Sequence, residues 1–155
     1  MNNGRLRQGP AFWEIGIAAA QIEVDTDTGA IRIPHYVSVA DVGVAINPQQ
    51  CEGQDEGASM QGLGHTLFEE MIYEDGQLLN PNMVDYKVPT FADLPGDLDS
   101  MMIENHDGPG PFGAKGLGEG GIVSAAPSVA NALFQATGVR IKDLPLTPER
   151  VWRAL

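Results

Sequence analysis

The sequence contains few of the residues on which several classes of protein depend. Cys51 is the only cysteine, so the chain cannot form an internal disulfide or supply the set of thiolates that an iron-sulfur cluster usually takes. There are 9 lysines and arginines against 21 aspartates and glutamates, and no basic run. The resulting net charge of -12 argues against nucleic acid and anionic membrane surfaces as partners.

Long apolar runs are also lacking. No segment approaches the roughly eighteen consecutive apolar residues that a membrane span requires. Basic residues precede a short apolar stretch at the N-terminus, but Glu14 and Gly16 interrupt that stretch and no cleavage site follows. A cytoplasmic protein without a membrane span is therefore predicted.

The histidines and clustered acids give no metal site. The histidines have no i, i+4 partner and no nearby cysteine, so ordinary packed or surface histidines are predicted. They are His35, His65 and His106. Four acidic residues are predicted to form a solvated helix face rather than a hydrolytic pair. They are Asp55, Glu56, Glu69 and Glu70.

Alternating apolar residues predict a β-hairpin. Residues 15–25 and 31–42 alternate, and the polar segment between them ends at Gly29, as is typical of a hairpin turn. Asn47-Pro48 then ends the second strand. Shorter strands are predicted at residues 100–104 and 141–144.

Helical spacing predicts two main helices. Residues 54–73 carry apolar side chains at helical intervals, and residues 122–137 resemble a buried helix that ends at Gly138. A small helix follows, with Thr147 as its cap and Pro148 in its first position. Three glycines weaken the first helix by about 1 kcal/mol each relative to alanine, so we expect close packing there. They are Gly57, Gly62 and Gly64.

The predicted fold class is α+β, with a β-hairpin or small mixed sheet packed by two main helices. The few predicted strands are not enough to form a closed sheet. Residues 1–155 are therefore expected to form a single partial domain, the C-terminal portion of a larger domain. Residues 1–12 are expected to be a flexible lead. Five methionines are expected to fill the core, namely Met60, Met71, Met83, Met101 and Met102.

A glycine-rich loop at residues 107–121 leads directly into the second main helix. Free backbone N–H groups and the helix dipole make such a junction attractive to anions. Gly116-Leu-Gly118-Glu-Gly-Gly121 matches the dinucleotide-binding pattern, and Asp143 lies at a suitable distance for a ribose contact. No strand precedes the pattern, however, so nucleotide binding is the weaker alternative.

Glu119 is the unusual residue of this loop. It lies between Gly118 and Gly120 at the helix start, where the dipole favours a negative charge and little bulk shields the side chain. An exposed carboxylate of this kind suits a general base. It also suits a residue that satisfies free N–H groups of the helix, and spacing alone leaves both interpretations open.

Several segments together carry a resemblance to a known family. They are Asp41-Val-Gly-Val-Ala-Ile-Asn-Pro48, Gln54-Asp-Glu-Gly-Ala-Ser-Met-Gln-Gly-Leu-Gly64, Gly113-Ala-Lys-Gly-Leu-Gly-Glu-Gly-Gly121, Ala125-Ala-Pro-Ser-Val-Ala-Asn-Ala-Leu133 and Leu144-Pro-Leu-Thr-Pro-Glu-Arg-Val151. In order and spacing they resemble the C-terminal end of the molybdopterin-binding large subunit of molybdenum hydroxylases. That family contains xanthine dehydrogenase, aldehyde oxidases and oxidoreductases, aerobic carbon monoxide dehydrogenase and N-heterocycle hydroxylases.

The resemblance implies a catalytic role for Glu119. In that family the matching glutamate lies beside molybdenum and acts as the base, while a water-derived oxygen is inserted at an electron-poor carbon and hydride passes to the metal. An aldehyde or a nitrogen heterocycle is the implied substrate. A metal lowers the pKa of a bound oxygen, so an available carboxylate beside it is chemically reasonable.

The resemblance also implies the cofactor-binding residues. Gln54 matches a glutamine that hydrogen-bonds the pterin, although a solvated glutamine is the ordinary alternative at such a position. The backbone of the loop is expected to approach the cofactor or the substrate. Its residues are Lys115, Gly116, Leu117 and Gly118. The side chain of Lys115 is expected either to pair with an acid or to be solvated.

The departure from the family is length, since its molybdenum subunits are several times longer. The chain is therefore expected to be a split subunit or a fragment, inactive alone, that shares molybdenum-molybdopterin with a partner carrying the rest of the domain. Iron-sulfur clusters and FAD are expected only on partner subunits. The remaining alternative is a non-catalytic assembly module of the same complex.

Overall fold

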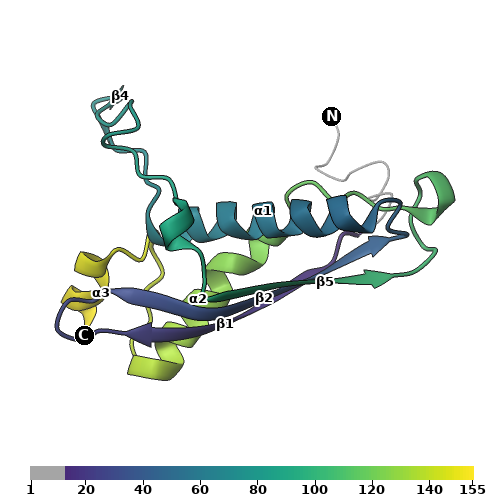
Figure 1. Ribbon diagram of the computed structural model, residues 1–155. Helices are drawn as coiled ribbons and strands as arrows, with labels where there is room; N and C mark the ends of the chain where they lie inside the picture. Colours follow the sequence, from purple (N-terminus) through teal and green to yellow (C-terminus); the bar gives the residue numbers. More distant parts are fainter. Residues whose placement is uncertain (1–12) are drawn as a thin grey trace, which may run out of the picture.

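Three strands form one mixed sheet in a computed structural model of the chain, which describes residues 13–155 (Figure 1). β1 (Gly16–Val24) pairs with β2 (Ile31–Gly43) in antiparallel orientation. β5 (Asp97–Glu104) pairs with the other edge of β2 in parallel orientation, so the strand order is β1-β2-β5. The predicted lead at residues 1–12 lies outside the described residues.

The hairpin between β1 and β2 is confirmed, and its turn forms for local reasons. Asp25 Oδ1 accepts the backbone N–H groups of Asp27 and Thr28, which replaces ladder bonds that the turn cannot make. Gly29 has φ +74, a left-handed conformation that glycine adopts without steric cost. A Cβ at this position would overlap the backbone of the C-terminal helix, so the turn also packs against a distant segment.

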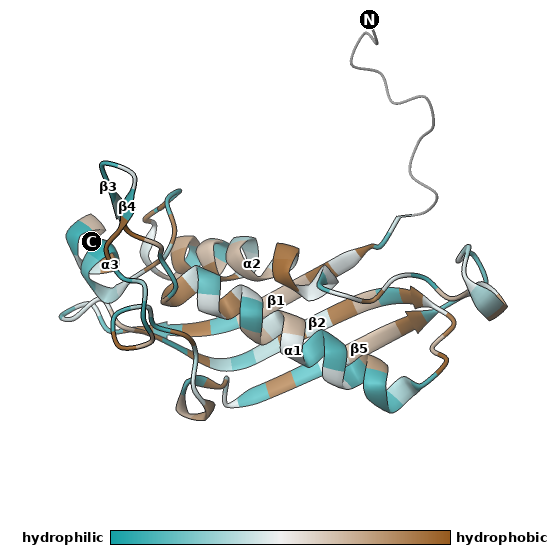
Figure 2. Ribbon diagram, turned by 90° about the horizontal axis from the view of Figure 1, so that it is seen from above, coloured by the Kyte–Doolittle hydropathy of each residue, from teal (hydrophilic) through white to brown (hydrophobic). Residues whose placement is uncertain are grey.

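Two helices cover one face of the sheet, as the view from above shows (Figure 2). α1 (Pro48–Leu67) lies toward β5 and α2 (Gly120–Thr137) lies along β1. Their apolar side chains and the inner residues of β2 form the core, where full burial of each aliphatic side chain contributes about 1.5–3 kcal/mol. Its buried members are Ile33, Tyr36, Leu63, Leu67, Ala125, Val129, Leu133, Leu146 and Val151. This arrangement confirms the predicted α+β fold class.

α1 starts and ends earlier than predicted. Asn47 caps it, since Asn47 Oδ1 accepts the N–H of Gln50, and Pro48 takes the first helical position. β2 ends at Gly43, so residues 44–47 connect the strand to the helix, and Asn47-Pro48 begins the helix rather than ending the strand. At the other end the N–H groups of Phe68 and Glu69 both bond to the carbonyl of Gly64, and the chain leaves the helix there.

Of the elements predicted in the C-terminal part of the chain, the two helices are confirmed. α2 ends where Gly138 adopts φ +76, and α3 (Pro148–Ala154) is capped by the Thr147 hydroxyl, which accepts the N–H of Arg150. The strand predicted at residues 141–144 is wrong. This segment pairs with no strand, although Ile141 packs against the core. Just after it, the N–H of Leu146 bonds to the carbonyl of Thr66 near the end of α1.

A short arm projects from the two layers at the top left of Figure 1. It contains the hairpin of β3 (Tyr73–Glu74) and β4 (Gln77–Leu78). Further along the chain, the 3₁₀ turn η1 (Phe91–Asp93) lies back beside the end of α1 and the start of β2. Asn80 fixes the base of the arm, because its side chain accepts the N–H of Ile72 and donates to the carbonyl of Glu70.

The prediction that the five methionines fill the core is wrong for three of them, which are more than half exposed. They are Met71, Met83 and Met101. None of the described helices is both long and apolar enough to cross a membrane.

Candidate active site

The glycine-rich loop is attached to the end of β2 by backbone hydrogen bonds. The N–H of Lys115 donates to the carbonyl of Val42 at 3.0 Å, and the N–H of Val44 donates to the carbonyl of Gly113 at 3.1 Å. Just before this contact the 3₁₀ turn η2 (Pro111–Gly113) reverses the chain. The loop therefore crosses the end of the sheet in a fixed register before it reaches α2.

The Lys115 side chain strengthens the same attachment. Lys115 Nζ donates to Asp41 Oδ2 at 2.6 Å, and the two side chains are only 7% and 14% exposed. Asp41 Oδ1 also accepts from Asn105 and from the N–H of Gly43. The hydrogen bond from Lys115 is the main reason why the pKa of Asp41 lies below its usual value. Of the two expectations for this lysine, pairing with an acid is confirmed.

Glu119 occupies the N-cap position of α2, but its side chain does not cap the helix. Its φ and ψ are -130 and 27, and no cap hydrogen bond involves its carboxylate. Instead, Gln61 Nε2 donates to Glu119 Oε1 at 3.1 Å, and the side chain remains exposed. The capping interpretation of this carboxylate is therefore wrong.

Gln54 lies close to Glu119 through a contact with the preceding residue. Its Nε2 donates to the carbonyl of Gly118 at 2.6 Å, so the glutamine is exposed but not merely solvated. Beside it a shallow hollow of about 340 Å³ separates α1 from the loop. Its lining residues are Ile46, Asn47, Gln50, Cys51, Gln54 and Leu117.

The other loop residues predicted to bind the cofactor lie on the same exposed edge. Gly116 and Gly118 are exposed and Leu117 is half-buried. No atom of the described chain lies within 4 Å of the point where a Cβ of Gly118 would be, so packing within this chain does not demand glycine there. The edge thus combines an exposed carboxylate, an exposed amide and a loop backbone with free space at Gly118.

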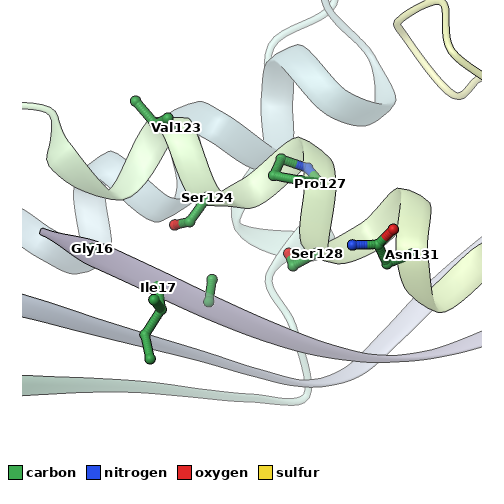
Figure 3. A pocket seen from close by; sticks show the side chains of 8 residues that line it. Gly16, Ile17, Val123, Ser124, Pro127, Ser128 and Asn131 are labelled. Atoms are coloured by element: carbon green, nitrogen blue, oxygen red, sulfur yellow. The ribbon is translucent and has the colours of Figure 1, made fainter.

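A hollow of about 390 Å³ lies against Glu119 and continues into a groove between β1 and α2. The hollow is lined by Glu14, Gly16, Glu119, Gly120 and Val123. The groove measures about 350 Å³ and shares Gly16 and Val123 with the hollow. Figure 3 shows Ser124, Ser128 and Asn131 along the α2 side of this groove.

Glu14, the second acid of this hollow, was not predicted as a site residue. Burial, followed by the nearby charge of Asp55, raises the pKa of Glu14 above its usual value. The Glu14 carboxylate lies where a Cβ of Gly120 would be, so the two residues are in direct contact. The alternation of β1 placed Glu14 just before a strand, but a contact with residue 120 could not be read from that spacing.

Asp55 was predicted to lie on a solvated acidic face, and this was wrong. It is 1% exposed, and its carboxylate accepts from the hydroxyls of Ser38 and Ser100 at 3.2 and 2.7 Å. These serines lie on β2 and β5, so one buried carboxylate ties α1 to both strands. Two hydroxyl donors satisfy a carboxylate that would otherwise be costly to bury.

The backbones of α1 and α2 approach each other closely at two glycines. A Cβ on Gly62 would lie 2.6 Å from the Cβ of Ala125, and one on Gly121 would lie 3.1 Å from the N of Ser59. The expected close packing is thus confirmed at Gly62. It is also confirmed at Gly64, where the side chains of Glu69 and Pro89 fill the place of a Cβ. It is wrong at Gly57, which has free space around it. This close crossing carries the Gln61 side chain to Glu119.

The site has no cluster of metal-ligating side chains of its own. Within residues 13–155 no group of three histidine, cysteine or acidic side chains could hold a metal ion. His35 pairs with Asp99 at 2.7 Å on the sheet. The dinucleotide-like glycines follow η2 and a loop rather than a strand, so they lack the βαβ context that nucleotide binding requires.

Comparisons with known proteins agree on one family. The family profile of the molybdopterin cofactor-binding domain matches residues 2–95. The chain is 36% identical over 141 residues to the probable hypoxanthine oxidase XdhD of Escherichia coli K12, with 90% of this chain covered. It is 41% identical to the 6-hydroxypseudooxynicotine dehydrogenase complex subunit gamma of Paenarthrobacter nicotinovorans, with 88% covered. It superposes on the aldehyde oxidoreductase of Desulfovibrio gigas with a TM-score of 0.78 and 35% identity over 86% of its length.

The chain is much shorter than these proteins. It spans 15% of the hypoxanthine oxidase, 18% of the nicotine-pathway subunit and 14% of the aldehyde oxidoreductase. In each of these larger chains, the matched fold is accompanied by several hundred further residues that this sequence does not contain.

Proposed function

The chain belongs to the molybdopterin cofactor-binding domain family, and on this basis we propose that it is part of a molybdenum hydroxylase in which Glu119 is the catalytic base. The observation that carries this proposal is the state of the Glu119 carboxylate. It lies at a helix start without capping the helix, it is exposed, and Gln61 bonds only one of its oxygens.

The residues of the exposed edge fit the molybdenum-molybdopterin cofactor. A pterin offers hydrogen-bond donors and acceptors along its rim, which amide side chains and backbone groups can match. Gln54 and the backbone of residues 115–118 would hold the group, and the free space at Gly118 allows a close approach. When bound, the cofactor would supply the redox centre that takes up two electrons from the substrate.

The chain itself would supply proton transfer and its geometry. Glu119 Oε2 has no hydrogen-bond partner among the described residues, so this oxygen is available to accept a proton. Gln54 fixes the carbonyl of the preceding residue, and the Lys115–Asp41 pair fixes the start of the loop. General-base assistance of this kind contributes about 100-fold to 10,000-fold in rate.

The substrate and partners follow from the same proposal. The relatives are named for hypoxanthine, nicotine-derived and aldehyde substrates, which share an electron-poor carbon. We expect an aldehyde or a nitrogen heterocycle here. The chain would act with a partner that carries the rest of the molybdenum domain, and with iron-sulfur and flavin subunits that remove the electrons.

The test is Glu119→Gln in the complex purified from the native host. We expect kcat to fall by at least about 100-fold, because glutamine keeps the shape but cannot accept the proton. Glu52→Gln, on an exposed part of α1, is the matched control and should keep full activity. Molybdenum content, measured in each preparation, should be equal.

Full activity of Glu119→Gln with normal molybdenum content would contradict the proposal. The chain would then be better described as a non-catalytic assembly module of the same complex.

A further inference from the structure

We propose that Gln61 is a positioning residue that holds the Glu119 carboxylate in its reactive orientation. The inference rests on the proposed function, because it concerns the residue named there as the base. The contact itself is direct, since Gln61 Nε2 donates to Glu119 Oε1 at 3.1 Å.

Gln61 belongs to a pair of glutamines on one face of α1. It follows Gln54 by seven residues, which in a helix is two turns along nearly the same face and about 10 Å along the axis. Gln54 bonds the carbonyl of Gly118, and Gln61 bonds the side chain of the next residue, Glu119. One helix therefore fixes both the backbone and the side chain at this point of the loop.

The helix that presents Gln61 is itself firmly placed. Asp55 is buried and bonded to Ser38 and Ser100, which lie on two different strands. Gly62, the residue next to Gln61, packs against Ala125 of α2 with no room for a Cβ. The amide of Gln61 is thus presented from a rigid support, as a positioning group requires.

Glu119 needs such a support more than most side chains. It is exposed, does not cap its helix, and accepts no other hydrogen bond from residues 13–155. Without Gln61 its rotatable bonds would sample several staggered orientations. The hydrogen bond selects one orientation, engages Oε1 and leaves Oε2 free. An exposed hydrogen bond adds little to folding stability, so stability alone is a weak reason for this contact.

Steady-state kinetics of the complex provides the first test. We expect Gln61→Met to lower kcat by about 10-fold to 100-fold with KM changed by no more than about twofold, because misplacing a reacting group affects the chemical step. Gln61→Glu has the same shape but lacks the amide donor, and it should lose activity as well. Gln49→Met, an exposed glutamine at the start of the same helix, should retain activity. Unchanged kcat in both Gln61 variants would overturn the proposal.

A double-mutant cycle separates positioning from general damage. If Gln61 acts through Glu119, then Gln61→Met should cause no further loss in a Glu119→Gln background. If the substitution merely disturbs the fold, the two losses should multiply, and that result would contradict the positioning role.

Chemical labelling gives a readout that does not depend on turnover. A water-soluble carbodiimide with an amine couples to accessible carboxyl groups, and peptide mass spectrometry measures the extent at Glu119 and, as an internal control, at Glu52. We expect Gln61→Met to change labelling at Glu119 several-fold and to leave Glu52 unchanged. Altered labelling together with an active Glu119→Gln enzyme would mean that the contact is real but the proposed function is wrong. Unaltered labelling would contradict the positioning role itself.

Discussion

The Lys115–Asp41 ion pair joins the glycine-rich loop to β2 through side chains that are largely withdrawn from water. Asn105 and the N–H of Gly43 complete the hydrogen bonds of the same carboxylate. Removing one partner of such a pair lowers the free energy of unfolding, because the other charge is left largely buried without a partner of opposite charge. The pair therefore governs both the stability of the loop and the placement of Glu119.

The pair predicts a pH-dependent stability. The pKa of Asp41 is held below its usual value of 3.8, chiefly by the Lys115 hydrogen bond. Its stabilisation is therefore present above that value and is lost as the pH falls through the lower folded-state pKa. Lys115→Met should lower the free energy of unfolding at neutral pH by about 2–3 kcal/mol.

Urea unfolding of the chain at several pH values checks this prediction. The difference between wild type and Lys115→Met should shrink as the pH falls below 3.8. Lys142→Met, an exposed lysine outside the loop, should behave as wild type. A difference that is the same at all pH values would show that Asp41 is not the partner that matters.

Glu119 could be singled out as the proposed base from local sequence, but its neighbours could not be predicted. Glu119 stands out because glycines flank it at a helix start. Its contact with Gln61 joins residues 58 positions apart and depends on how two helices cross. Asp55 was misjudged for a related reason, because its serine donors lie on strands whose parallel pairing has no local signal.

The crossing of α1 and α2 sets the distance between Gln61 on α1 and Glu119 at the start of α2. Gly62 and Gly121 let the backbones meet, and the Gln61 amide then reaches the start of α2. Overpacking at such a contact forces backbone shifts that usually cost about 1–3 kcal/mol.

Gly62→Ala is predicted to destabilise the chain by about 1–3 kcal/mol, because the new Cβ would lie 2.6 Å from the Cβ of Ala125. Adding Ala125→Gly should recover part of the loss by removing the opposing methyl group. Gly57→Ala is the matched control on the same helix. It has free space, so it should stabilise the chain by about 1 kcal/mol through helix propensity. Thermal or urea unfolding measures all three, and a neutral Gly62→Ala would contradict the close crossing.

Elements with strong local signals were predictable, whereas pairings and boundaries were not. The β1–β2 hairpin, α2 with Gly138 and α3 with Thr147 all follow from turn and cap chemistry. α1 began earlier than expected because Asn47-Pro48, which was expected to end the strand, caps the helix instead. The strand predicted at residues 141–144 is absent because no strand lies beside this segment, and Ile141 packs against the core instead.

Large apolar side chains are exposed on two parts of the described chain. On the sheet face away from the helices, Ile17, Met101 and Ile103 are more than half exposed. Phe91 in η1 is 89% exposed. Contiguous apolar surface of this kind usually marks contact with another chain. The proposed partner that carries the rest of the molybdenum domain accounts for these side chains, since the chain spans only 14–18% of the relatives described above.

The central claim is that this chain works as one component of a molybdenum enzyme, and affinity purification from the native host tests it most directly. Metal analysis and mass spectrometry of the recovered material supply the readout, with an unrelated acidic protein carrying the same tag as the control. We expect molybdenum to co-purify with a larger chain and with iron-sulfur and flavin subunits. A lone, metal-free chain would contradict it.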